Sequence, residues 1–135
     1  MQAYLAIKYH PDHSNRSRIE GISAIVHAHN CNTVCITRDI EQWGSIHFDA
    51  ATLMQKSFEA IDACDLVVVD LTEKGVGIGI EAGYAYAKRI PIFTIAQKTA
   101  DISETLRGIS KQVFLYKRYE DLHQCFEEMI CNIKR

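Results

Sequence analysis

Residues 66–83 read Leu66-Val-Val-Val-Asp70-Leu-Thr-Glu-Lys-Gly75-Val-Gly77-Ile-Gly79-Ile-Glu81-Ala-Gly83. The unbroken apolar run at 66–70 is typical of a central parallel strand that is covered on both faces. Three alternate glycines then open a helical pattern whose single acid is Glu81. Glycines leave room for a ligand near the backbone, and a helix N-terminus offers unpaired N–H groups. We therefore expect a strand, a ligand-binding loop and a helix, with Glu81 in the first turn, ionised at neutral pH and able to act as a nucleophile.

Short β-like runs alternate with helical patterns on both sides of this stretch. Strands are expected at 3–8, 33–37, 66–71, 92–96 and 113–116. Ser17 and Glu20 resemble a capping box for the first helix, and Asp49 is a candidate N-cap for a helix at 50–63. Strict alternation predicts an α/β three-layer sandwich with a flavodoxin-like, five-stranded parallel sheet in the order 2-1-3-4-5. A chain of 135 residues fits a single domain, residues 1–135.

In such sheets, ligands bind at the carboxyl ends of the strands, near the switch point between strands one and three. Lys8 follows the first strand, and Asp70 begins the segment that leads to Gly79. Lys8 is either a phosphate contact or ordinary surface charge. Asp70 either binds a sugar hydroxyl or caps its own loop. Glu81 falls in the same crevice from sequence geometry alone.

Composition excludes several function classes. A net charge of −2 argues against a nucleic-acid polymer as partner, and no apolar run is long enough to span a membrane. The five cysteines include no Cys-x-x-Cys pair, which predicts reduced thiols and a cytoplasmic protein. His10 and His13 flank Pro11-Asp12, but a metal site needs three or four converging ligands, so we expect no metal and no cofactor.

The glycine loop does not fit the common phosphate-binding motifs. A P-loop is excluded because no Gly-Lys-Ser/Thr ends it, and a dinucleotide fingerprint has different glycine spacing and follows the first strand. A purely structural alternative is tight packing of helix on strand, with Glu81 as a solvated acid near the helix start.

The segment from Cys64 to Pro91, with its Gly-x-Gly-x-Glu81-x-Gly-x-Ala pattern, resembles the nucleoside 2-deoxyribosyltransferase family, which includes the 2′-deoxynucleoside 5′-phosphate N-hydrolases. Tyr4 is similar to a tyrosine of that family's first strand. Ser103, in Ser-x-x-x-Arg-Gly, is similar to a serine that holds a 5′-phosphate across a dimer interface. The resemblance implies a homodimer in which Glu81 attacks the anomeric carbon of a nucleoside or nucleoside 5′-monophosphate and Tyr4 orients it. The expected substrate-binding residues are Lys8, Asp70, Gly75, Gly77, Gly79 and Ser103.

Two positions depart from the family pattern. Gly75 stands where the transferases carry an acid, and Ser57 lies near the position of an aspartate that protonates the leaving base. Hydrolysis and base transfer therefore both stay open. Two alternatives to a (deoxy)nucleoside-cleaving enzyme also stay open: a catalytically weak or inactive nucleotide-sensing module, and an NAD glycohydrolase of the Toll/interleukin-receptor-like type.

Overall fold

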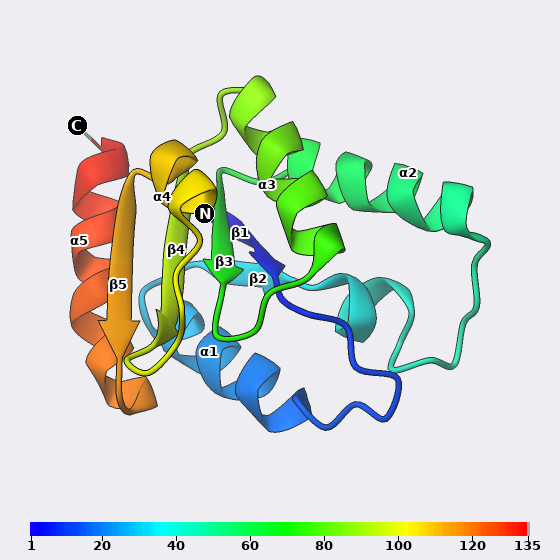
Figure 1. The fold of residues 1–135 in the computed structure, drawn as a ribbon, viewed down its shortest axis with the longest axis horizontal. Helices are drawn as coiled ribbons and strands as arrows, with labels where there is room; N and C mark the ends of the chain where they lie inside the picture. Colours follow the sequence, from blue (N-terminus) through cyan, green and yellow to red (C-terminus); the bar gives the residue numbers. More distant parts are fainter. Residues whose placement is uncertain (135) are drawn as a thin grey trace.

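The computed structural model describes residues 1–134 and confirms the predicted α/β architecture. A five-stranded parallel sheet has the order β2-β1-β3-β4-β5. Its strands are β1 (Gln2–Ala6), β2 (Asn32–Val34), β3 (Leu66–Asp70), β4 (Ile92–Gln97) and β5 (Gln112–Tyr116). The helices are α1 (Arg16–Ala28), α2 (Ala50–Asp62), α3 (Val76–Ala87), α4 (Glu104–Ile109) and α5 (Leu122–Lys134), with the short helices η1 (Ile36–Ile40) and η2 (Tyr119–Asp121). Figure 1 shows the strands side by side with helices around them.

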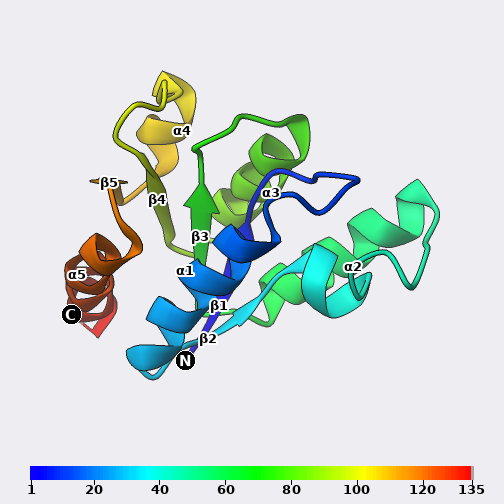
Figure 2. The same ribbon diagram turned by 90° about the horizontal axis from the view of Figure 1, so that it is seen from below.

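Alternate residues of each central strand enter two separate cores, one on each face of the sheet. Leu66 and Val68 of β3 pack with α1 and α5, whereas Val67 and Val69 pack with α2, α3 and α4. Figure 2 shows the sheet between these two layers of helices. All five residues of β3 are buried, as expected for a parallel strand covered on both faces.

The second strand is shorter than the sequence predicts. Only Asn32, Thr33 and Val34 pair with β1, and the expected continuation to Thr37 is wrong. From Ile36 the chain instead forms a π-helix, in which the Glu41 N–H donates to the carbonyl of Ile36 over 2.9 Å. The β-branched residues at this position favour a strand by propensity, but tertiary context overrides that preference. β1 likewise ends at Ala6 rather than Lys8.

The two predicted helix caps have different outcomes. Asp49 caps α2 as predicted, because its carboxylate accepts a hydrogen bond from the N–H of Thr52 over 2.7 Å. The expected capping box at Ser17 and Glu20 is wrong, because α1 already begins at Arg16 and no side chain caps it. Glu20 instead pairs with Arg16 one turn earlier, at 3.2 Å.

The cysteines are free thiols, and four of them are buried: Cys31, Cys35, Cys64 and Cys125. No helix within residues 1–134 is long and apolar enough to cross a membrane.

Candidate active site

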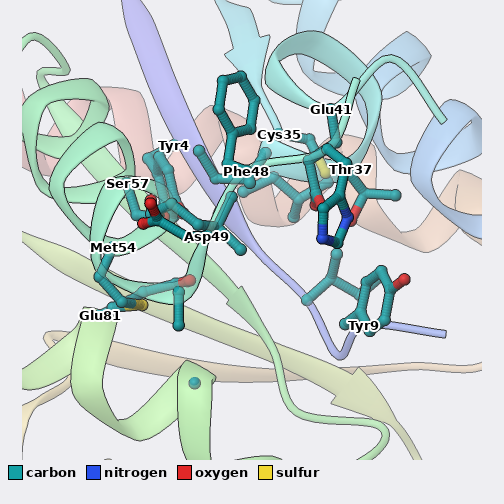
Figure 3. A pocket seen from close by; sticks show the side chains of 17 residues that line it. Tyr4, Tyr9, Cys35, Thr37, Glu41, Phe48, Asp49, Met54, Ser57 and Glu81 are labelled. Atoms are coloured by element: carbon teal, nitrogen blue, oxygen red, sulfur yellow. The ribbon is translucent and has the colours of Figure 1, made fainter. Parts of the chain in front are cut away.

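A cavity of about 500 Å³ lies beside the carboxyl end of β1, between α2, α3 and the segment around η1. Its volume is in the usual range of small-molecule sites. Glu81, Tyr4 and Ser57 lie at one end, and Tyr9, Thr37 and Glu41 lie at the other (Figure 3). The remaining lining residues are Leu5, Ile7, Cys35, Ile36, His47, Phe48, Asp49, Ala50, Leu53, Met54 and Gly77.

Helix α3 carries Glu81 into this cavity. Gly75 is the N-cap residue, and Ile78, Ala82 and Ala85 form the buried face that fixes the rotation of the helix. Glu81 is therefore the sixth helical residue, not part of the first turn as expected, and its side chain is partly buried. Burial raises the pKa of Glu81 to about 7, and a hydrogen bond from Tyr4 lowers it in part. The expectation that Glu81 stays ionised at neutral pH therefore holds only in part, because desolvation penalises the charged form.

Tyr4 reaches Glu81 from the sheet below. It lies on β1 among the residues that face α2 and α3, and only 1% of it is exposed. Burial, followed by the nearby Glu81 carboxylate, raises the pKa of Tyr4 far above its usual value. The Tyr4 hydroxyl therefore keeps its proton across the physiological range and can act as a permanent hydrogen-bond donor to Glu81.

Contacts between α2 and α3 hold the walls of the cavity together. The rings of Phe58 and Tyr84 stack with their centroids 4.2 Å apart, and the Tyr84 hydroxyl donates to Asp62 over 2.8 Å. Ser57, which faces the cavity, donates its hydroxyl to the carbonyl of Leu53 over 2.9 Å. This end of the cavity is consequently a packed and prearranged surface.

A strained loop follows η1, next to Glu41 at the opposite end of the cavity. Gln42, Trp43 and Gly44 have φ angles of 47°, 56° and 87°, in the left-handed region that bulky residues rarely adopt. The Trp43 N–H donates to the carbonyl of Thr37 over 2.8 Å, and the Arg16 guanidinium lies 4.6 Å from the centre of the Trp43 ring. Trp43 therefore anchors the loop by packing. Strain held in this way is characteristic of functional sites.

Gly77 lines the cavity directly, and a Cβ added there would meet no other atom within 4 Å. Its backbone φ is not in the left-handed region. Neither packing nor backbone conformation therefore demands glycine at this position. The absence of a side chain instead leaves space inside the cavity.

Three other predicted residues lie together elsewhere. Gly75, Gly79 and Ser103 line a second hollow of about 350 Å³ between α3 and α4. Ser103 is the N-cap of α4, where its hydroxyl accepts from the N–H of Leu106 over 3.4 Å. The structure thus separates these residues from the Glu81 cavity within one chain.

Asp70 is the last residue of β3, and Lys8 lies in the loop after β1, beside Gly75 at the α3 N-terminus. Asp70 is 1% exposed, and one of its carboxylate oxygens accepts from the N–H and the hydroxyl of Thr72, over 3.0 and 2.6 Å. Burial raises its pKa. Lys8 lies 4.0 Å from Glu73, whose carboxylate also contacts His10 at 3.0 Å and Arg18 at 3.2 Å. Asp70 organises its own loop, and Lys8 belongs to a cationic cluster around Glu73.

Sequence reasoning missed much of the cavity. Thr37, Glu41 and His47 were not predicted site residues, because no local pattern distinguishes them. Asp49 was predicted only as a helix cap, although it also lines the cavity. Within residues 1–134, no three His, Cys, Asp or Glu side chains are grouped to hold a metal ion.

Comparisons with known structures agree on the fold. A CMP N-glycosidase from Clostridium botulinum superposes with a TM-score of 0.68 and 18% identity, covering 96% of this chain and 99% of the other. A 2-deoxyribosyltransferase from Bacillus psychrosaccharolyticus superposes with a TM-score of 0.74 and 12% identity, covering 91% of this chain and 90% of the other. A conserved protein from Enterococcus faecalis V583 superposes with a TM-score of 0.71 and 17% identity, covering 96% of this chain and 98% of the other.

Curated protein sequences contain no significant match to this chain. The family model described as nucleoside 2-deoxyribosyltransferase, in contrast, matches residues 3–129. That span includes Tyr4 of β1, the whole cavity and α5 as far as Met129. The resemblance read from the sequence is confirmed, and this chain belongs to the nucleoside 2-deoxyribosyltransferase family.

Proposed function

We propose that this protein cleaves or transfers at the N-glycosidic bond of a (deoxy)nucleoside or nucleoside 5′-monophosphate, with Glu81 as nucleophile. The observation that carries the proposal is the Glu81 carboxyl group, which lies with Tyr4 at the end of a cavity of about 500 Å³. The activities named for two structural neighbours, a CMP N-glycosidase and a 2-deoxyribosyltransferase, support the same reaction class.

In the proposed reaction, a carboxylate oxygen of Glu81 attacks the anomeric carbon, and the electron pair of the carbon–nitrogen bond leaves with the base. The glycosyl ester that forms is then resolved by water or by a second base. A carboxylate nucleophile divides one difficult displacement into two easier ones, as in retaining glycosidases. With a pKa of about 7, a substantial fraction of Glu81 is ionised at neutral pH.

Each residue near the reaction has a distinct proposed task. Tyr4 donates to one Glu81 oxygen and so leaves the other free to attack. Gly77 gives the sugar access to Glu81 without a side chain in the way. Lys8 contributes positive charge beside the N-terminus of α3, where a 5′-phosphate is favoured. These steps use a carboxylate, a hydroxyl and water, and they require no metal or cofactor.

A homodimer is part of the proposal. Val76, Ile80 and Tyr86 of α3 are 83%, 46% and 59% exposed, which is unusual for apolar residues on one helix. A second copy packed on α3 would cover them and bring its own Gly75, Gly79 and Ser103 towards the substrate of the first. Asp70 supports the substrate loop from beneath. The free thiols fit a reducing compartment, so we place the enzyme in the cytoplasm.

The test is incubation of the pure protein with nucleosides, 5′-monophosphates, their deoxy counterparts and NAD, with and without an acceptor base. Chromatography separates the outcomes: free base without acceptor indicates hydrolysis, and a new nucleoside only with acceptor indicates transfer. Release of nicotinamide from NAD would assign the protein to glycohydrolases of a different substrate class. Binding of a nucleotide without any product would replace the proposal with a sensing module.

A further inference from the structure

Breaking an N-glycosidic bond places an electron pair on the departing base, and a proton supplied to the base speeds this step. The Glu81 end of the cavity offers no suitable donor. The Ser57 hydroxyl is engaged with the carbonyl of Leu53, and Tyr4 holds its proton too strongly. If the protein acts as proposed above, the proton must come from elsewhere in the cavity.

Besides Glu81, two carboxyl groups line the cavity, Asp49 and Glu41. Asp49 is exposed and accepts the N–H of Thr52, which lowers the pKa of Asp49 and keeps it charged. Glu41 is partly buried, and burial raises its pKa, although the nearby His13 and His47 act in the opposite direction. Of these two groups, Glu41 is the one suited to carry a proton.

The backbone fixes the position of Glu41. Its N–H donates to the carbonyl of Ile36 over 2.9 Å, and its carbonyl accepts from the N–H groups of Gly44 and Ile46, each over 3.0 Å. These bonds span the π-helix and the strained loop after it. π-helical turns and strained backbone both concentrate at functional sites. The loop therefore presents Glu41 to the cavity in a defined place.

The chemistry of the cavity indicates that the base, not the phosphate, lies at this end. Ile36, Phe48 and Tyr9 provide apolar and aromatic walls for a flat ring. Within residues 1–134, no Lys or Arg lines the cavity, so a phosphate at this end would lie beside the Glu41 and Asp49 carboxyl groups with no Lys or Arg to balance its charge. The sugar must lie at Glu81, and a base attached to it then extends towards Glu41 (Figure 3).

We propose that Glu41 is the catalytic acid that protonates the leaving base. As Glu81 bonds to the anomeric carbon, the carbon–nitrogen bond breaks and its electron pair goes to the base. The Glu41 carboxyl proton moves to the base, which leaves neutral, and Glu41 becomes a carboxylate. In hydrolysis, a water then adds to the anomeric carbon, the bond to Glu81 breaks with its electron pair returning to the Glu81 carboxylate, and the proton lost by that water goes to Glu41. Glu41 thereby supplies the proton that the Ser57 hydroxyl, which is bonded to the carbonyl of Leu53, does not.

The test compares Glu41→Gln and Glu41→Asp with wild type on the nucleotide that wild type cleaves and on its halogen-substituted base analogue. A halogen stabilises the leaving base without a proton, so the analogue depends less on the acid. Glu128→Gln, an exposed change on α5 across the sheet, is the matched control. Circular dichroism checks that each variant is folded.

Glu41→Gln is expected to lower kcat about 100- to 10,000-fold on the natural base and much less on the analogue. In the wild type, kcat should fall at high pH because Glu41 loses the proton that it donates. Glu41→Gln should abolish this fall, whereas Glu41→Asp, which keeps a carboxyl group, should retain it. Equal losses on both bases, or no loss, would overturn the role of Glu41 while leaving the proposed function intact. If wild type releases no base from either compound, the proposed function itself fails.

Discussion

Replacing Glu81 with Gln should stabilise the protein at alkaline pH. The Glu81 pKa is raised from 4.5 to about 7 because burial disfavours the carboxylate. Above the unfolded-state pKa, the folded protein must either hold a costly charge or keep a proton that the unfolded chain releases. Gln has nearly the same shape and no charge to desolvate. The wild-type protein therefore loses free energy of unfolding as the pH rises, and the variant does not.

The sign and size of this cost follow from linkage. A folded pKa above the unfolded value means that the folded state binds more protons, so the free energy of unfolding falls as pH rises. The fall begins near pH 4.5 and levels off above pH 7. At about 1.4 kcal/mol per pKa unit, the wild type should lose about 3 kcal/mol relative to Glu81→Gln between pH 4.5 and pH 8.

Urea unfolding at pH 4.5, 6 and 8 measures this difference for both proteins. Glu128→Gln, which removes an exposed charge on α5, should stay within about 0.5 kcal/mol of wild type at each pH. The reasoning is refuted if wild type and Glu81→Gln show parallel stability curves across this range. Such a result would mean that water reaches Glu81 freely and that its cavity does not desolvate it.

Three further predictions address the groups around Glu81. Tyr4→Phe removes the hydrogen bond that lowers the Glu81 pKa, so the acid limb of kcat/KM should move to higher pH in a pH–rate profile; an unmoved limb would show that Tyr4 does not act on Glu81. Asp49→Ala removes the hydrogen bond from the N–H of Thr52 and should lower the urea midpoint of unfolding, and an unchanged midpoint would exclude a stabilising cap. Glu73→Gln removes the negative charge that pairs with Lys8, which leaves Lys8 free to bind a phosphate. KM should therefore fall for a 5′-monophosphate but not for its nucleoside, and equal changes in both would contradict a phosphate role for Lys8.

The sheet order was predictable because the apolar runs are separated by clear helical patterns. Leu66 to Asp70 could hardly form anything but a central strand, and it fixes the place of the glycine loop. Asp49 as a cap was predictable for a similar reason, since the interaction is local in sequence. Family membership was predictable from the residues around Glu81, and the match over residues 3–129 confirms it.

The η1 end of the cavity was not predictable from local pattern. Ile36 and Thr37 have high β-propensity, yet the chain leaves the sheet after Val34 and forms a π-helix. That geometry depends on three consecutive residues in left-handed conformations and on packing of Trp43 against Arg16. Glu41 lies between this π-helix and the loop, so its position in the cavity could not be predicted from the sequence either.

The titration of Glu81 could not be predicted either. Its place near the start of a helix suggests a stabilised carboxylate. In the structure it lies beyond the first turn, where α2 and Tyr4 shield it from water. Desolvation there outweighs any attraction of the helix N-terminus and raises the pKa to about 7. The decisive contacts come from β1 and α2, which are distant in sequence.

Base release by wild type and Glu81→Gln, measured side by side by chromatography, tests the central claim most directly. The account predicts free or transferred base from at least one nucleoside or nucleotide with wild type. It predicts none above background with Glu81→Gln, although that variant is folded and at least as stable. Turnover by Glu81→Gln at the wild-type rate would contradict the account, because the nucleophile would then have to be another group.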